Sequence, residues 1–226
     1  MSTARVFLGV GHGGKDPGAV SNGFYEKDLN LSIAMACQSG LIRHGVVVGM
    51  SRTTDENDDL SEEISECNSF NPDLAIDIHN NAGGGDGAEV YHHSGGGTSK
   101  ILAVNILDEI VKVGQNSRGA KVRKNASGTD YYGFIRTTKA PAVIVECAFV
   151  DNAKDMQILD TEDERKAMGV AIAKGVLRTL GIAYKDPTTT LYRVQVGAFR
   201  NKSNAEQMLT KLKKDGYEGF IVTANA

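Results

Sequence analysis

Apolar and polar positions along the chain alternate between short apolar runs and longer stretches with helical spacing. The first run, residues 6–10, ends in a glycine-rich segment, a pattern typical of a buried strand followed by a loop. From Glu26 to His44 apolar residues recur every four positions, which predicts a helix that ends at Gly45. The same alternation predicts further strands at 46–48, 74–79, 89–92 and 142–146 and further helices at 60–70, 99–113 and 163–180. Together they indicate an α/β domain with a mainly parallel, twisted sheet and helices on both faces.

The last part of the chain has a different pattern. Residues 183–190 are typical of a linker, so the sequence predicts a main domain at 1–182. Beyond the linker, residues 191–226 predict a small β-α-β unit with a strand at 191–199, a helix at 203–215 and a strand at 220–223. Its 36 residues are too few to bury a core alone. The unit must rest on the main domain, pair with a second copy in a homodimer, or be the first half of a larger domain, and the pattern leaves these options open.

Composition and charge narrow the classes of function. The 25 basic and 28 acidic side chains are interspersed and give a formal net charge of −3, which disfavours a nucleic-acid binder. No stretch reaches the roughly 18 apolar residues of a membrane span, and the first apolar run is too short for a signal peptide. The three cysteines, Cys37, Cys67 and Cys147, are odd in number and far apart, which favours a reducing compartment. We therefore expect synthesis in the cytoplasm without a signal peptide, with no nucleic acid and no membrane span.

Four ionisable residues fall at the same predicted edge of the sheet. Ligands of open α/β sheets bind at the carboxyl ends of strands, because loops from neighbouring strands meet there. His12 follows the first strand, His79 ends the third, and Glu146 stands in the C-terminal part of the fifth. Glu26 begins the helix after the first strand, which starts at the same edge. Two imidazoles and a carboxylate form a catalytic zinc site with a position left for water, and a further carboxylate could transfer protons.

Each of these residues also has a structural explanation. A histidine in a glycine-rich loop is often exposed and idle, and Glu26 suits the positive end of a helix dipole. Glu146 is the most informative, because a carboxylate within an apolar strand is unfavourable unless it is paired or bound to a metal. Their coincidence at one edge favours a functional site.

Two competing motifs are weaker. Residues 9–15 match the G-x-x-x-x-G-K spacing of a phosphate loop, but Asp16 stands where a Ser or Thr hydroxyl should meet Mg²⁺. A nucleotide-binding α/β protein is therefore a minor alternative. Cys147 is a conceivable nucleophile, but strand alternation points it away from the face of Glu146, so we expect a packed thiol. We expect His92 and His93 at the surface.

Six ordered segments carry a more specific signal. They are GHGGKDPGA (11–19), EK (26–27), SRTTD (51–55), DIHNNA (77–82), GAEVY (87–91) and PAVIVECAFVDN (141–152). Together they resemble the zinc-dependent N-acetylmuramoyl-L-alanine amidases of the amidase-3 family over about residues 4–182.

The resemblance implies a reaction and roles for named residues. The reaction is hydrolysis of the amide between the lactyl group of N-acetylmuramic acid and the L-alanine of the peptidoglycan stem peptide. One Zn²⁺ per chain would be held by His12, Glu26 and His79, with Glu146 as the catalytic acid and base. Asn81 and Arg118 would bind substrate.

The chain departs from the family in the predicted helix at 60–70. The family usually has an arginine after the leucine and then an Ala-Asn pair, whereas here Leu60 is followed by Ser-Glu-Glu63 and later by Cys67-Asn68. We expect these departures to alter local salt bridges away from the metal. Some regulated members insert a helix that blocks the site, and residues 118–141 show no long helical pattern, so we expect an unblocked site.

Residues 191–207 resemble the start of a SPOR-type peptidoglycan-binding repeat, of which this chain holds one half. Peptidoglycan is thus the implied partner, and the implied place of action is the cell wall, after release by a route other than a signal peptide. The leading hypothesis is a lytic amidase, either a prophage endolysin or a sporulation autolysin. The alternative is a wall-binding protein whose amidase domain is catalytically inactive.

Overall fold

The computed structural model describes residues 3–187 and 194–223. The chain divides into two compact units, Met1–Lys185 and Asp186–Ala226, which are treated separately. The division falls inside the segment predicted to be a linker.

A six-stranded sheet forms the centre of the first unit, with strand order β4-β1-β5-β8-β6-β7. Its strands are β1 (Arg5–Val10), β4 (Val47–Met50), β5 (Leu74–Asn81), β6 (Ala88–His92), β7 (Ser117–Lys121) and β8 (Ala142–Phe149). All neighbours are parallel except β6 and β8. A separate two-stranded hairpin, β2 (Val20–Ser21) and β3 (Phe24–Tyr25), precedes the first helix. The predicted, mainly parallel sheet is confirmed.

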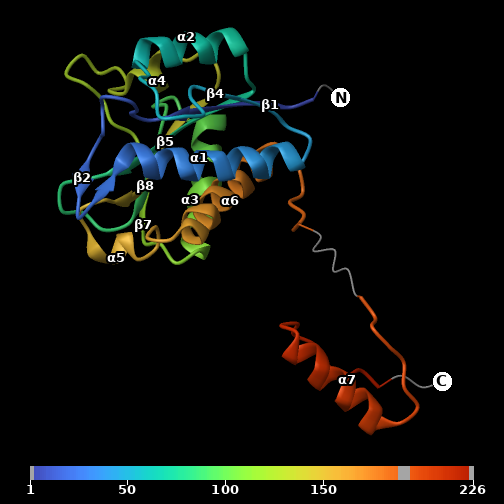
Figure 1. Cartoon of the computed structure of the whole chain (residues 1–226). Coiled ribbons are helices and arrows are strands. Elements are labelled where there is room, and N and C mark those ends of the chain that lie inside the picture. Colours follow the sequence, from blue (N-terminus) through green and yellow to red (C-terminus); the bar gives the residue numbers. More distant parts are fainter. Residues whose placement is uncertain (1–2, 188–193, 224–226) are drawn as a thin grey trace. The chain divides into compact units, whose positions relative to one another are not determined.

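Helices cover both faces of this sheet, as predicted (Figure 1). One face packs against α1 (Glu26–Arg43), α3 (Thr98–Lys112) and α6 (Glu162–Thr179), and the other against α2 (Leu60–Phe70) and α4 (Gly133–Thr137). The short α5 (Ala153–Met156) follows β8. Among the described residues, no helix has the length and apolar character needed to cross a membrane.

Side chains alternate across the strands and build a core on each face. Leu8 and Ile76 pack with the helices α1, α3 and α6, whereas Phe7, Ala75 and Ile144 pack with α2 and α4. All five are buried. Burial on both faces explains why the strands read as continuous apolar runs, and each large apolar side chain fully removed from water contributes about 1.5–3 kcal/mol.

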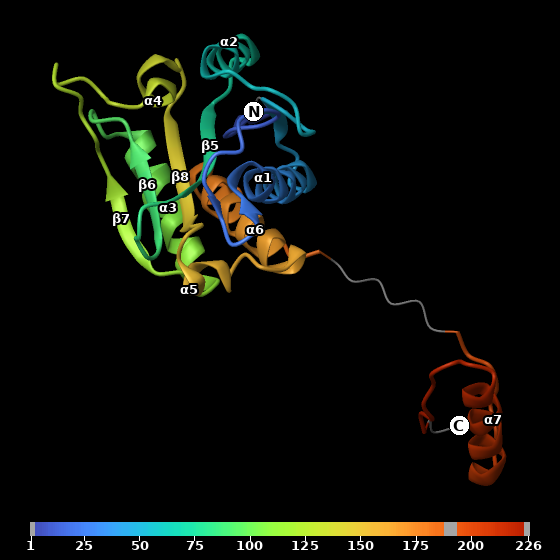
Figure 2. The same cartoon turned by 60° about the vertical axis from the view of Figure 1, so that its left-hand side comes forward.

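The parallel order fixes where polar residues meet. β1, β5 and β8 are adjacent and run in one direction, so their carboxyl ends lie at one edge of the sheet. Figure 2 shows β8 between β5 and β6. Val10 pairs with Ile78, and His79 pairs with Glu146. α1 follows β1 through a short loop and hairpin and begins at the same edge.

The described residues of the second unit contain one helix, α7 (Lys202–Lys214), whose first turn is capped by the Asn201 side chain. The helix agrees with the predicted one, but residues 194–199 and 220–223 are not in strands, and the predicted strand residues 191–193 lie outside the described residues. Apolar side chains such as Val194 and Phe220 are exposed. A strand needs a neighbour to pair its backbone groups and cover one face, and so short a segment supplies neither by itself.

Removal of residues 186–226 is expected to leave the first unit folded. Both hydrophobic clusters of the first unit consist only of residues that precede Lys185, so the melting temperature of a chain ending at Lys185 should match that of the full chain to within about 1 °C. Thermal unfolding followed by circular dichroism measures this. A drop of several degrees would show that the tail contributes to the stability of the first unit.

Candidate metal centre and active site

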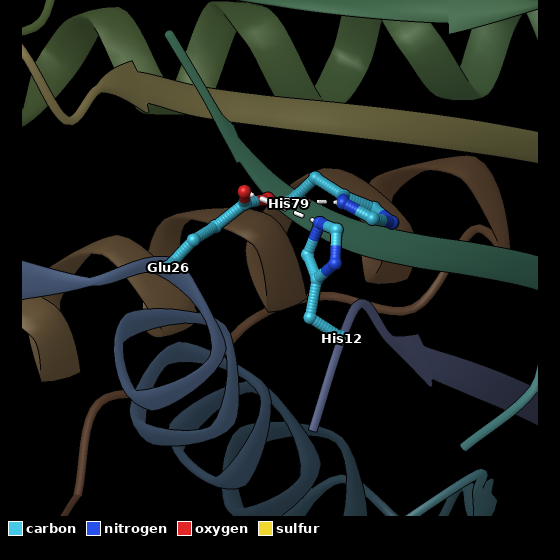
Figure 3. A group of neighbouring side chains, drawn as sticks. All are labelled: His12, Glu26 and His79. Atoms are coloured by element: carbon cyan, nitrogen blue, oxygen red, sulfur yellow. Dashed lines mark hydrogen bonds and ion pairs between the residues drawn. The ribbon is translucent and has the colours of Figure 1, made fainter. Parts of the chain in front are cut away.

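Three side chains converge at the predicted edge of the sheet: His12, Glu26 and His79 (Figure 3). Their ligand atoms all lie within 4.8 Å of one another. His12 Nε2 is 3.2 Å from Glu26 Oε2, and His79 Nδ1 is 3.1 Å from Glu26 Oε1. The three come from the loop after β1, the first residue of α1, and β5. The residues predicted as metal ligands are thus brought together.

The local backbone is shaped so that these side chains can meet. His12 has a left-handed backbone with φ of 62°, a conformation that non-glycine residues adopt mainly where the surrounding structure enforces it. A Cβ atom at Gly11 would collide with the His79 ring, and one at Gly18 would collide with Glu26 and His12. Glycine at these two positions therefore allows the loop to approach the ligands closely.

A buried arginine ties this loop to the helix. The Arg52 guanidinium donates hydrogen bonds to the carbonyl oxygens of Val10 (3.0 Å), Gly11 (3.3 Å) and Lys27 (2.7 Å). Gly11 directly precedes His12 in the chain, and Lys27 directly follows Glu26. Arg52 stands in one of the family segments, but reasoning from the sequence gave it no role. A basic residue two positions after the end of β4 was the available signal.

Glu26 is ionised despite its burial. Burial by itself would raise the pKa of this carboxyl, but hydrogen bonds with His12 and His79 outweigh it and place the pKa below its usual range. The backbone N–H groups of Ala19 (2.8 Å) and Asn80 (3.1 Å) also donate to the carboxylate. A buried anion is therefore held between two imidazoles.

The second nitrogen of each histidine also faces a carboxylate. His12 Nδ1 lies 2.8 Å from Asp16 Oδ2, and His79 Nε2 lies 3.2 Å from Asp77 Oδ2. Metal-binding histidines commonly donate their other ring N–H to a carboxylate, which fixes the ring and raises its basicity. Sequence reasoning missed these two partners, although both lie within the family segments.

The donor set fits a zinc ion. Two imidazole nitrogens and one carboxylate, partly or fully buried and orientated by further carboxylates, match the ligand types of a catalytic zinc site. The pKa of His12 is raised, mainly by its hydrogen bond with Glu26. Protons therefore compete with a metal for this site, and metal binding should weaken as the pH falls.

Glu63 corrects one expectation from the sequence. It was expected to act away from the metal, but a Cβ built on Gly9 would touch both its carboxyl and that of Asp77, so the two groups are neighbours beside His79. Glu63 Oε1 and Asp77 Oδ1 are buried with no hydrogen-bond partner among the described residues. Burial and the charge of Asp77 raise the pKa of Glu63 well above its usual range.

Glu146 lies on β8, paired in register with His79. Its Oε2 atom is buried and has no hydrogen-bond partner in the described part of the chain. Burial raises the pKa of Glu146 to about 7, and the nearby His79 opposes this increase. A carboxyl with a pKa near neutrality can accept a proton and return it.

Comparison with known proteins decides the family. The sequence model described as N-acetylmuramoyl-L-alanine amidase matches residues 6–178. The chain belongs to this amidase family. The model described as SPOR domain matches residues 172–223, a range that begins inside α6.

Individual relatives agree with this assignment. The N-acetylmuramoyl-L-alanine amidase CwlM of Bacillus licheniformis is 32% identical over 221 residues, covering 96% of this chain and 84% of the relative. A sporulation-specific N-acetylmuramoyl-L-alanine amidase of Bacillus subtilis is 31% identical over 222 residues, with the same two coverages. The solved structure of Cwp6 from Clostridium difficile superposes with a TM-score of 0.78 at 38% identity, covering 79% of this chain and 30% of that one.

Asn81 and Arg118, the two residues expected to bind substrate, both donate hydrogen bonds to Glu89, which was not predicted as functional. Asn81 Nδ2 donates to Glu89 Oε1 at 3.0 Å, and Arg118 Nε donates to Glu89 Oε2 at 2.8 Å. Glu89 lies on β6, directly opposite Glu146. The family segment GAEVY contains Glu89, and that was its signal in the sequence.

Of the remaining expectations for the amidase domain, some are confirmed and one is wrong. Cys147 is buried as a packed thiol, and residues 118–141 contain only the five-residue helix α4, as expected. His92, however, is buried at 6% exposure, because its side chain points into the sheet face under α3 and only His93 reaches solvent. The glycine-rich loop after β1 leads into the β2–β3 hairpin, and a phosphate loop would lead directly into a helix.

Glu146 is expected to destabilise the metal-free protein at neutral and basic pH. Its pKa is about 7 in the folded chain and near 4.5 when exposed, so folding stability falls as the pH rises from about 4.5 to 7 and stays low above that. Glu146→Gln should therefore be about 1–3 kcal/mol more stable than the wild type at pH 8. Urea unfolding at pH 4 and pH 8 tests this, and equal differences at both pH values would contradict the raised pKa.

Proposed function

We propose that this chain is a zinc-dependent N-acetylmuramoyl-L-alanine amidase that cleaves the amide between the lactyl group of N-acetylmuramic acid and the L-alanine of the stem peptide. The convergence of His12, Glu26 and His79 beside Glu146, in a chain that belongs to the amidase family, carries the proposal.

His12, Glu26 and His79 would hold one Zn²⁺ per chain. When bound, zinc supplies Lewis-acid polarisation of the scissile carbonyl and lowers the pKa of the attacking water. Asp16 and Asp77 keep the two imidazole rings orientated, and Arg52 fixes the backbone that carries His12. These residues preorganise the ligands before any substrate binds.

Glu146 would transfer the protons of the reaction. Its carboxylate accepts a proton from the attacking water as the water oxygen adds to the amide carbon. It then donates that proton to the amide nitrogen, so the carbon–nitrogen bond breaks and the stem peptide departs with the amino group of its L-alanine neutral. In the metal-free chain burial raises the pKa of Glu146 to about 7, which makes this carboxylate a stronger base than an exposed glutamate.

Asn81 and Arg118 are proposed to bind substrate beside Glu146. Both side chains are polar, both are held by Glu89, and Arg118 is about one-third exposed. Hydrogen-bond donors at this position can orientate the stem peptide against the catalytic edge.

The C-terminal unit is proposed to bind peptidoglycan, in keeping with the SPOR match. Its exposed apolar side chains, among them Val194, Tyr217 and Phe220, need cover, which a homodimer through this unit would provide. We infer a lytic role at the cell wall after release from the cytoplasm, as a sporulation autolysin or a prophage endolysin. The relatives include a sporulation-specific amidase and a phage endolysin, so both roles remain in the proposal. An inactive wall-binding protein is disfavoured because all four site residues are present and assembled.

The metal proposal predicts zinc content. Purified wild-type protein should hold about one zinc per chain, and His12→Ala or His79→Ala should hold far less, since a three-ligand site cannot lose one ligand without a large loss of affinity. His93→Ala, an exposed histidine remote from these ligands, is the matched control and should keep its zinc. Metal analysis by mass spectrometry gives the stoichiometry. Full zinc in His12→Ala would exclude His12 as a ligand.

The reaction proposal predicts the products. Digestion of purified peptidoglycan should release stem peptides with a free L-alanine amino terminus and leave glycan strands with free lactyl groups, as read by mass analysis. Glu146→Gln should lower the rate by about 10²–10⁴-fold while retaining zinc and fold, because proton transfer is lost. The exposed Glu162→Gln serves as the control. Release of disaccharides or cleavage within the peptide would contradict the proposed bond.

A further inference from the structure

Glu89 is a buried carboxylate that accepts hydrogen bonds from four side chains. It is 3% exposed and accepts hydrogen bonds from Asn81 Nδ2 at 3.0 Å, Tyr91 OH at 2.8 Å, Arg118 Nε at 2.8 Å and the Lys121 ammonium. These donors come from β5, β6 and β7. One carboxylate therefore fixes side chains from three strands.

The position of Glu89 relates this cluster to the reaction. Glu89 and Glu146 are directly opposite one another on antiparallel strands, so their side chains lie on the same face of the sheet. Two carboxylates so placed repel each other unless one is neutralised. Burial would raise the pKa of Glu89, but hydrogen bonds from Lys121 and Arg118 outweigh it, so Glu89 stays ionised. The positive charges of Arg118 and Lys121 thereby reduce the repulsion between ionised Glu89 and the neighbouring Glu146.

The cluster has more positive than negative charge. Arg118 and Lys121 together carry two positive charges, and Glu89 is the sole acidic partner of either in an ion pair within the part of the chain that the structure describes. Their side chains are 36% and 33% exposed, so both reach solvent. The Arg118 guanidinium also lies over the Phe149 ring, 4.9 Å from its centroid, which restricts its orientation. One unneutralised positive charge, held in a defined place by Glu89, thus faces solvent on the strand next to β6.

We propose that Glu89 is a positioning residue, which holds Arg118 and Lys121 as a receptor for a carboxylate group of the stem peptide. The inference rests on the proposed function. It identifies the chemical group of the substrate that Arg118 and Lys121 recognise. Nε of Arg118 is used by Glu89, so the two terminal nitrogens can form a forked pair with a carboxylate. Without Glu89, both long side chains would be free to adopt many rotamers, and binding would have to order them.

Two soluble substrates test the receptor: an N-acetylmuramoyl-peptide with free carboxylates, and the same compound with those carboxylates converted to carboxamides. With zinc-loaded full-length protein, kcat/KM should favour the carboxylate substrate by about tenfold, mainly through KM, as expected for hydrogen bonds to a charged group. Arg118→Met and Lys121→Met should each reduce this preference. Cleavage of neither substrate would overturn the proposed function, whereas equal cleavage of both would leave that function standing and overturn the receptor.

Glu89→Gln separates positioning from simple charge. The substitution removes a negative charge and leaves two unneutralised cations, so long-range attraction alone would increase the preference for the carboxylate substrate. A positioning role predicts the opposite, a preference reduced to about that of Arg118→Met, with a double variant of the two no worse than either single one. An increased or unchanged preference in Glu89→Gln would overturn the positioning role.

Two further variants complete the test. Asp130→Asn removes another buried carboxylate, which accepts hydrogen bonds from Ser94 beyond the far end of β6, and should leave the preference unchanged. Should Glu89→Gln fail to fold, Arg118→Lys gives the same distinction, since it keeps the charge but loses the planar fork. Loss of the preference in Arg118→Lys supports a positioned receptor, and full retention overturns it.

Discussion

The buried carboxylate of Glu26 is the interaction on which the site depends. It stands at the first residue of α1, and it accepts hydrogen bonds from the Ala19 and Asn80 backbone while facing both His12 and His79. The loop after β1, the start of α1 and the end of β5 are therefore joined through one group. A buried anion is unfavourable unless paired, so the loop and strand are held to the helix by the same contacts that define the ligand set.

Three neighbouring carboxyls, those of Glu26, Glu89 and Glu146, have pKa values that are shifted in different directions. Two imidazoles hold Glu26 ionised, and Arg118 and Lys121 hold Glu89 ionised, whereas Glu146 has no cation within hydrogen-bond distance among the described residues and its pKa rises to about 7. Pairs of acids whose environments push their pKa values apart mark which group binds and which transfers protons. The strand order produces this separation, since β8 lies between the ligand strand β5 and the cation-supported strand β6.

The sequence allowed the sheet and the ligand set to be predicted because both follow from chain order. Parallel strands with crossover helices bring His12, His79 and Glu146 to one edge whatever the detailed packing, and α1 must start there with Glu26. Arg52 and Glu89 could not be assigned in this way, because their roles depend on which carbonyls or side chains surround them in space. The strand prediction is wrong for residues 194–199 and 220–223 for a related reason. Alternating apolar residues predict that a segment can form a strand, but a strand also needs a neighbour, and no spacing in the sequence supplies one.

Glu63 shows how a departure from the family pattern can be accommodated beside the metal ligands. Two buried oxygens, Glu63 Oε1 and Asp77 Oδ1, are both acceptors without donors when both groups are ionised. A single proton between them satisfies both, and the raised pKa of Glu63 identifies it as the group that carries the proton. The other oxygen of Asp77, Oδ2, lies 3.2 Å from His79 Nε2. Where the family usually has an arginine in this helix, this chain has a second carboxyl next to the one that orientates a metal ligand, and burial beside Asp77 raises the pKa of Glu63 well above its usual range.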